Sequence, residues 1–98
     1  MASDMNLEHF AAFQGQHFTV QLDAGVSVSA ELVEAHGLPA PPFQGRQPFS
    51  LLFKGPTTPR LLQRTYRLQP PAGAKPLDIF LVPVSADPTG VCYEAVFA

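Results

Sequence analysis

The run from residue 77 to residue 84 constrains the fold more than any other stretch of this chain. It reads Leu-Asp-Ile-Phe-Leu-Val-Pro-Val, is rich in strand-forming side chains and places apolar groups on both faces of a strand. Turn-forming residues at 85–90 separate it from a second strand-like run at 91–97. We therefore expect a hairpin whose first strand is buried on both faces, which requires a second layer over its outer face.

Residues 7–14 form the one segment with a helical pattern. Leu7, Phe10 and Ala11 fall at positions i, i+3 and i+4, so one face of a short helix is apolar. A helix of this length is unstable alone in water and must pack on the rest of the domain. We expect it to supply the missing cover of the 77–84 strand. The expected contact joins Leu7, Phe10 and Phe13 to Phe80, Val82 and Val84.

Four further segments alternate apolar and polar residues with a period of two, as half-buried strands do. They are residues 16–22, 26–32, 49–54 and 63–68. The chain has 7 glycine and 11 proline residues, and most of them lie between these segments, where they mark turns. Six short strands at regular spacing predict an all-β fold, a small antiparallel barrel or sandwich with one short N-terminal helix. The whole chain, residues 1–98, is expected to form a single domain.

A long connection at residues 36–48 interrupts the strands. Its prolines cannot donate to a β-ladder, so this segment is not the interior of a strand. A loop of this length inside a compact domain is typical of a functional or mobile segment. We expect Leu38 and Phe43 to hold it against the body of the domain.

Charge and composition exclude several classes of function. The net charge of −2 gives no basic excess for a nucleic acid or an anionic membrane. No apolar run approaches the roughly 20 residues of a spanning helix, and residues 1–6 contain no basic secretory leader. The single cysteine, Cys92, forms no internal disulfide. We therefore expect a cytoplasmic monomer or weak homodimer, with no nucleic-acid or membrane partner.

Several motifs together resemble a family of small bacterial proteins of unknown function. The resemblance covers nearly the whole chain and includes an entry of the form Leu-Glu-x-Phe at residues 7–10 and one of the form Gly-Gln-x-Phe at residues 15–18. The later motifs are Phe49, Leu51, Phe53, Gly55 and Pro56, then Thr65, Tyr66 and Leu68, then residues 77–83 and 93–97. The family supplies no catalytic residues. The resemblance also implies a link to bacterial gene neighbourhoods that encode phage-tail-collar-like proteins.

The residues that can carry a reaction do not form a recognisable set. His9, His17 and His36 lack a carboxylate or cysteine at metal-ligand spacing. No serine occupies a G-x-S-x-G elbow, and no glycine-rich phosphate loop leads into a helix. Asp78 and Glu94 remain a candidate carboxylate pair for a hydrolase, although solvated or ion-paired side chains are the commoner case. We expect no catalytic, cofactor-binding or metal-binding residue, and no enzyme activity.

Most of the positive charge lies on the third and fourth predicted strands and on the link between them. An aromatic residue accompanies it, so this region is a candidate surface for binding a partner protein. The candidate interaction patch consists of Lys54, Arg60, Arg64, Tyr66 and Arg67. The alternative is an ordinary solvated face on which arginine stems cover apolar surface.

The sequence therefore favours a non-enzymatic domain for protein-protein interaction or a structural accessory role. An exposed edge strand or the 36–48 loop is the expected contact surface. The alternative is a barrel that binds a small ligand in an interior cavity. Such a cavity would be lined by Phe18, Phe49, Phe53, Phe80 and Phe97.

Overall fold

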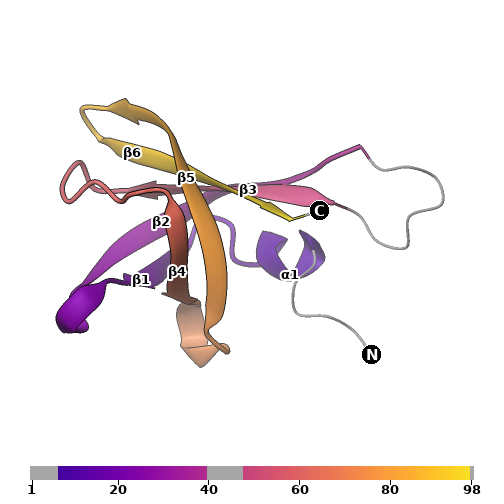
Figure 1. Cartoon of the computed structure of the whole chain (residues 1–98). Coiled ribbons are helices and arrows are strands. Elements are labelled where there is room, and N and C mark those ends of the chain that lie inside the picture. Colours follow the sequence, from indigo (N-terminus) through magenta and orange to yellow (C-terminus); the bar gives the residue numbers. More distant parts are fainter. Residues whose placement is uncertain (1–6, 40–47, 98) are drawn as a thin grey trace.

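The structure is a computed structural model that describes residues 7–39 and 48–97 (Figure 1). Six antiparallel strands close into a barrel in the order β1-β2-β3-β6-β5-β4, preceded by a short helix. The strands are β1 (His17–Gln21), β2 (Ser27–Gly37), β3 (Phe49–Gly55), β4 (Arg64–Gln69), β5 (Leu77–Asp87) and β6 (Gly90–Phe97). The helices are α1 (Leu7–Ala11) and two 3-10 turns, η1 (Asp23–Gly25) and η2 (Pro71–Gly73). The predicted all-β fold is confirmed, and of the two predicted architectures the structure has the barrel and not the sandwich.

The strand β5 is longer than predicted because it serves two neighbours in turn. Its first part, residues 77–81, pairs with β4, and its second part, residues 82–87, pairs with β6. The register against β6 shifts between Pro83 and Ser85, where a bulge adds one residue to β5 shortly after the change of partner. The hairpin turn between β5 and β6 is therefore confined to residues 88–89.

The strand β2 also continues past its predicted end at residue 32 and reaches Gly37. Its register against β3 shifts between Leu32 and Glu34. Such a bulge adds one residue to the strand and reverses the alternation that follows it. The apolar-polar alternation therefore breaks at this point, although the strand itself continues.

The base of the predicted 36–48 loop is closed by a backbone hydrogen bond. The N–H of Leu38 donates to the carbonyl oxygen of Pro48 at 2.9 Å. Residues 40–47, including Phe43, lie outside the described residues, so the expected contact of Phe43 with the body of the domain stays a prediction.

The interior of the barrel is filled by side chains. Phe18 of β1 and Phe53 of β3 meet edge to face, with ring centroids 5.2 Å apart. Leu61 and Tyr93 add a long-range contact, because the Leu61 N–H donates to the Tyr93 hydroxyl oxygen at 2.8 Å in a buried position. The buried core residues are Phe10, Phe18, Val20, Ala30, Leu32, Phe49, Leu51, Phe53, Leu61, Tyr66, Leu68, Ile79, Leu81, Val91, Tyr93 and Ala95.

The helix α1 closes one end of the barrel, next to the C-terminal end of β6 (Figure 1). Phe10 is fully buried, and its ring centroid lies 5.8 Å from that of Phe49 and 5.5 Å from that of Phe97. Gly15 has a φ of 88° and turns the chain from the helix toward β1, while its N–H donates to the carbonyl oxygen of Leu32 at 2.8 Å. Among the described helices, none has the length and hydropathy needed to cross a membrane.

The prediction that α1 covers the outer face of the 77–84 strand is wrong. Phe80 is 49% exposed and Val84 is 50% exposed, whereas Ile79 and Leu81 point into the barrel and are buried. A closed barrel has one interior, so a strand that is apolar on both faces still buries only one of them. The helix instead buries Phe10 in the open end of the barrel, where side chains from two strands surround it.

A closed ring also changes the expectation of an exposed edge strand. Each described strand pairs with two neighbours, so none has a free edge along its whole length. Several strands nevertheless extend beyond the ladder that they form with one of their two neighbours. Along β2, for example, the ladder with β3 covers Glu31 to Gly37 and leaves residues 27–30 without a partner on that side.

Candidate functional site

The five residues of the predicted patch do not lie together. Lys54 is on β3 and Arg67 is on β4, and two strands separate β3 from β4 in either direction around the barrel. Arg67 is also engaged, because its Nε donates to the Asp78 carboxylate at 3.1 Å on the outside of the neighbouring strand β5. The hydrogen bond to Asp78 and the charge of that carboxylate raise the pKa of Arg67. Because both side chains are exposed, the two form an ordinary surface ion pair.

The other three predicted residues do meet, in a hollow of about 420 Å³ that we call the basic groove. It opens where β1 and β4 stop pairing, beyond the pair Gln21 and Arg67, and the link between β3 and β4 contributes part of its lining. Val26 and Leu62 give it exposed apolar side chains, with 54% and 72% of their surface accessible. The basic groove is lined by Leu22, Asp23, Val26, Pro59, Arg60, Leu61, Leu62, Arg64 and Tyr66.

The backbone around Leu62 is held from both sides. Its predecessor Leu61 is buried and is bonded to Tyr93, and the Tyr66 hydroxyl donates to the carbonyl oxygen of Leu62 at 2.7 Å. Neighbouring residues in an extended link point in opposite directions, so burying the side chain of Leu61 turns that of Leu62 toward solvent. The exposure of Leu62 is therefore built into the fold.

The charges of the basic groove are only partly balanced. The Arg64 guanidinium lies over the ring of Tyr66, 5.0 Å from its centroid, and 3.7 Å from the carboxylate of Asp23. The Asp23 side chain is 92% exposed, so this ion pair is weak. Arg60 forms no salt bridge with any described residue. The groove thus combines apolar side chains with two arginines that can still bind a carboxylate.

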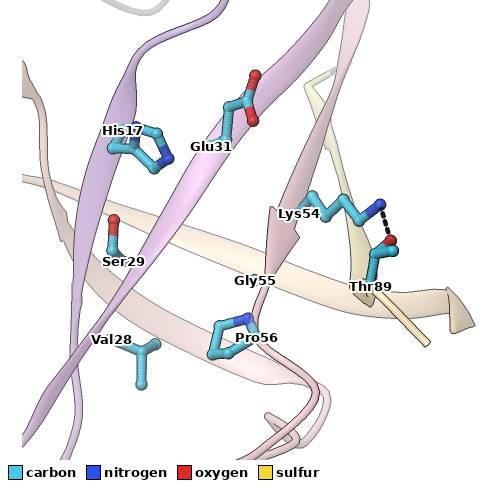
Figure 2. Close-up of a pocket in the computed structure, with 8 residues that line it drawn as sticks. All are labelled: His17, Val28, Ser29, Glu31, Lys54, Gly55, Pro56 and Thr89. Carbon is cyan, nitrogen blue, oxygen red and sulfur yellow. Dashed lines mark hydrogen bonds between the residues drawn. The ribbon is translucent and has the colours of Figure 1, made fainter. Parts of the chain in front are cut away.

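A second hollow, which we call the side hollow, has a volume of about 540 Å³ and lies where β2 and β3 separate (Figure 2). The Lys54 ammonium points away from β2 and donates to the hydroxyl oxygen of Thr89, and it lies 3.8 Å from the Asp87 carboxylate. Glu31 forms no salt bridge within the described part of the chain. The lining residues are His17, Val28, Ser29, Glu31, Lys54, Gly55, Pro56 and Thr89.

The two carboxylates considered for a hydrolase lie far apart. Asp78 pairs with β4 and is bound to Arg67, whereas Glu94 stands opposite Val82 on β6. Asp78 and Val82 are four residue steps apart along β5, which corresponds to about 13 Å. Glu94 instead lines a third hollow with Glu34 and His36. Asp78 and Glu94 therefore do not share a cleft.

The histidines are likewise dispersed. His9 lies edge-on to Phe10 and Phe13, with centroids 5.3 and 5.4 Å apart, while His17 and His36 line different hollows. Within residues 7–39 and 48–97, no group of three or more His, Cys, Asp or Glu side chains is arranged to hold a metal ion.

The phenylalanines expected to line a ligand cavity do not all face the interior of the barrel. Phe18, Phe49 and Phe53 are buried in contact with other rings, so they fill the interior instead of lining an empty space. Phe97 is half-buried and stacks on Phe49 at 4.7 Å, and Phe80 points outward. The described residues therefore do not favour the small-ligand alternative.

Sequence reasoning missed the two residues that expose most apolar surface around the basic groove, Val26 and Leu62. The Leu61-Leu62 doublet was the signal that could have found one of them, because two adjacent large apolar residues in an extended link cannot both face the core. Val26 carried no signal of its own, since it begins an alternating segment whose later members do point inward.

Comparisons with known proteins agree with the resemblance drawn from the motifs. No curated protein and no solved structure matches this chain. A family model matches residues 5–97, nearly the full length. The chain therefore belongs to the family described as "Domain of unknown function (DUF6916)".

Proposed function

We propose that this chain is a non-enzymatic domain that binds a partner protein through the basic groove. The observation that carries the proposal is Leu62, a large apolar side chain held 72% exposed by hydrogen bonds on either side of it. Holding an apolar group in water has no benefit for folding. Contiguous exposed apolar surface often marks a protein interaction site, and arginine and tyrosine, both present in the groove, are enriched among the central contacts of interfaces.

The chemistry of the groove defines the partner segment that fits it. Val26 and Leu62 favour an apolar side chain, and Arg60 and Arg64 favour a carboxylate. The expected partner is therefore a peptide segment that is both apolar and acidic. The family resemblance makes a protein of a phage-tail-like assembly, in the cytoplasm of a bacterium, the first partner to examine.

A peptide-display selection on the immobilised full chain tests this proposal. Peptides that enrich are measured by fluorescence polarisation against the native protein and the variants Leu62→Ser and Arg60→Glu. The control is Val96→Ser, because Val96 is also an exposed apolar residue, 60% accessible, but lies outside the groove. We expect enriched peptides to combine acidic and large apolar residues and to bind each groove variant about tenfold more weakly, a loss of about 1.4 kcal/mol.

The control variant should bind those peptides as the native protein does. The proposal is contradicted if the enriched peptides bind Leu62→Ser as tightly as the native chain, or if no peptide enriches. Peptides that lose affinity equally for Val96→Ser would place the contact elsewhere on the barrel and would also contradict it.

A further inference from the structure

Where β2 and β3 separate, one edge of β2 is left open inside the side hollow (Figure 2). The β2–β3 ladder ends at the pair Glu31 and Lys54. Continued in the same register, Ser29 would face Pro56, which has no N–H to donate. Pro56 therefore gives a physical reason for the β2–β3 ladder to stop at Glu31 and Lys54.

The direction in which the open backbone groups point follows from the ladder on the other side. Leu22 donates its N–H to the Val26 carbonyl oxygen at 2.7 Å, and Leu32 donates to that of Gln16 at 2.9 Å. In an antiparallel pair, alternate residues direct both backbone groups to the same edge. The even-numbered residues of β2 from 26 to 32 therefore bond toward β1, and Ser27 and Ser29 point the other way.

We infer that this open edge, at Ser27 and Ser29, accepts an extended segment of a partner protein, which joins the barrel as an added strand. Two free N–H groups and two free carbonyl oxygens at alternate positions are what an added strand requires. Ser27 and Ser29 are exposed, and Val28 between them is half-buried. The inference does not depend on the basic groove, which lies at a different seam of the barrel.

Another open edge, along the second part of β5, is protected in ways that β2 is not. Pro83 removes a donor from it, and the bulge between Pro83 and Ser85 distorts it. Both features are known means of preventing an edge strand from pairing. Residues 27–30 of β2 contain neither proline nor a register shift against β1.

The shape and charge of the side hollow indicate what enters it. The side hollow is lined by β3 residues and by Thr89 of the β5–β6 hairpin as well as by β2, so an added strand would lie against all three. A single extended segment can enter. Because Lys54 is engaged by Asp87 and Thr89, the Glu31 carboxylate is the unbalanced charge, and a segment with a lysine or arginine is favoured.

The test uses the full chain and an acetylated, amidated hexapeptide of sequence Lys-Val-Thr-Val-Thr-Val as the probe. Amide hydrogen exchange is followed by NMR, residue by residue. In the free protein, the amides of Ser27 and Ser29 should exchange rapidly while those of Val28 and Ala30 are protected. At about 90% saturation with peptide, exchange at Ser27 and Ser29 should slow about tenfold, because only the free fraction remains open.

Two controls separate backbone pairing from simple adhesion. The peptide Lys-Val-Pro-Pro-Thr-Val keeps the charge but loses one donor from each edge, and it should not protect either serine. The variant Ser29→Pro removes an N–H from the open edge without removing one from the β1 ladder, and it should abolish binding. If that variant does not fold, Glu31→Gln serves instead, with an expected affinity loss of about twofold to fivefold.

The inference is overturned if Ser27 and Ser29 are already protected in the free chain, or if the probe leaves their exchange unchanged at several millimolar. Equal protection by the proline-containing peptide would overturn it too. Sedimentation that finds a dimer of the free chain, lost in Ser29→Pro, would identify a second copy as the occupant and would likewise contradict the proposed partner segment.

Discussion

Replacing Phe10 with alanine tests how the short helix contributes to the barrel. Phe10 is fully buried at the open end of the barrel, against the stacked rings of Phe49 and Phe97. Removing a buried phenylalanine side chain costs about 3–5 kcal/mol, from lost burial and from the cavity left behind. Domains of this size unfold with a free energy of about 5–15 kcal/mol, so the loss is a large fraction of the total.

The matched control is Phe80→Ala, the same change on the outer face of β5. Phe80 is 49% exposed, so the expected cost is at most about 1 kcal/mol. Urea unfolding followed by circular dichroism measures both free energies, and thermal unfolding should place Phe10→Ala at least about 12 °C below the native chain. If Phe80→Ala costs as much as Phe10→Ala, the helix covers the outer face of β5, and its assignment to the end of the barrel is wrong.

Three further changes test individual contacts. Tyr93→Phe leaves the buried Leu61 N–H without its acceptor, so urea unfolding should find a loss of about 1–3 kcal/mol, and a loss near zero would contradict the role of this hydrogen bond. Gly90→Ala places a Cβ against the carbonyl oxygen of Gly55, so the variant should be destabilised by about 1–3 kcal/mol, whereas Gly73→Ser, with open space around it, should show a smaller loss measured in the same way. The hydrogen bonds that the Thr89 hydroxyl and N–H donate to Asp87 lower the pKa of its carboxyl below the usual 3.8, so the stability it contributes is present above that value and is lost as pH falls through the lower, folded-state pKa. NMR titration should therefore find Asp87 more than half ionised at pH 3.8, and Thr89→Val should return its pKa toward the usual value; an unchanged pKa in that variant would contradict the assignment.

The strands were predictable from the sequence because alternation depends only on which residues face the core. That signal located all six strands, but it failed at the two bulges, where one added residue reverses the alternation. It also could not decide between the faces of β5, because Ile79 and Phe80 are equally apolar and only barrel closure determines which of them is inside.

The candidate site was harder to predict because it depends on the order of strands around the barrel. Lys54 and Arg67 come from consecutive strands of the chain, which suggested one surface. In the barrel, β6 and β5 lie between β3 and β4, so the two residues face different sides. Arg60, Arg64 and Tyr66 lie together because they belong to one continuous segment, so their proximity can be predicted without knowing the strand order.

The central claim is that this domain acts through the outside of a filled barrel, at the basic groove. The most direct measurement is an NMR titration of the native chain with an acidic, apolar peptide taken from the selection, with the shifts of all assigned amides recorded. We predict that the largest shifts fall on residues 22–26 and 59–66, around Leu62. Shifts concentrated instead on the interior residues Phe18 and Phe53 would mean that the ligand enters the barrel, and would contradict the claim.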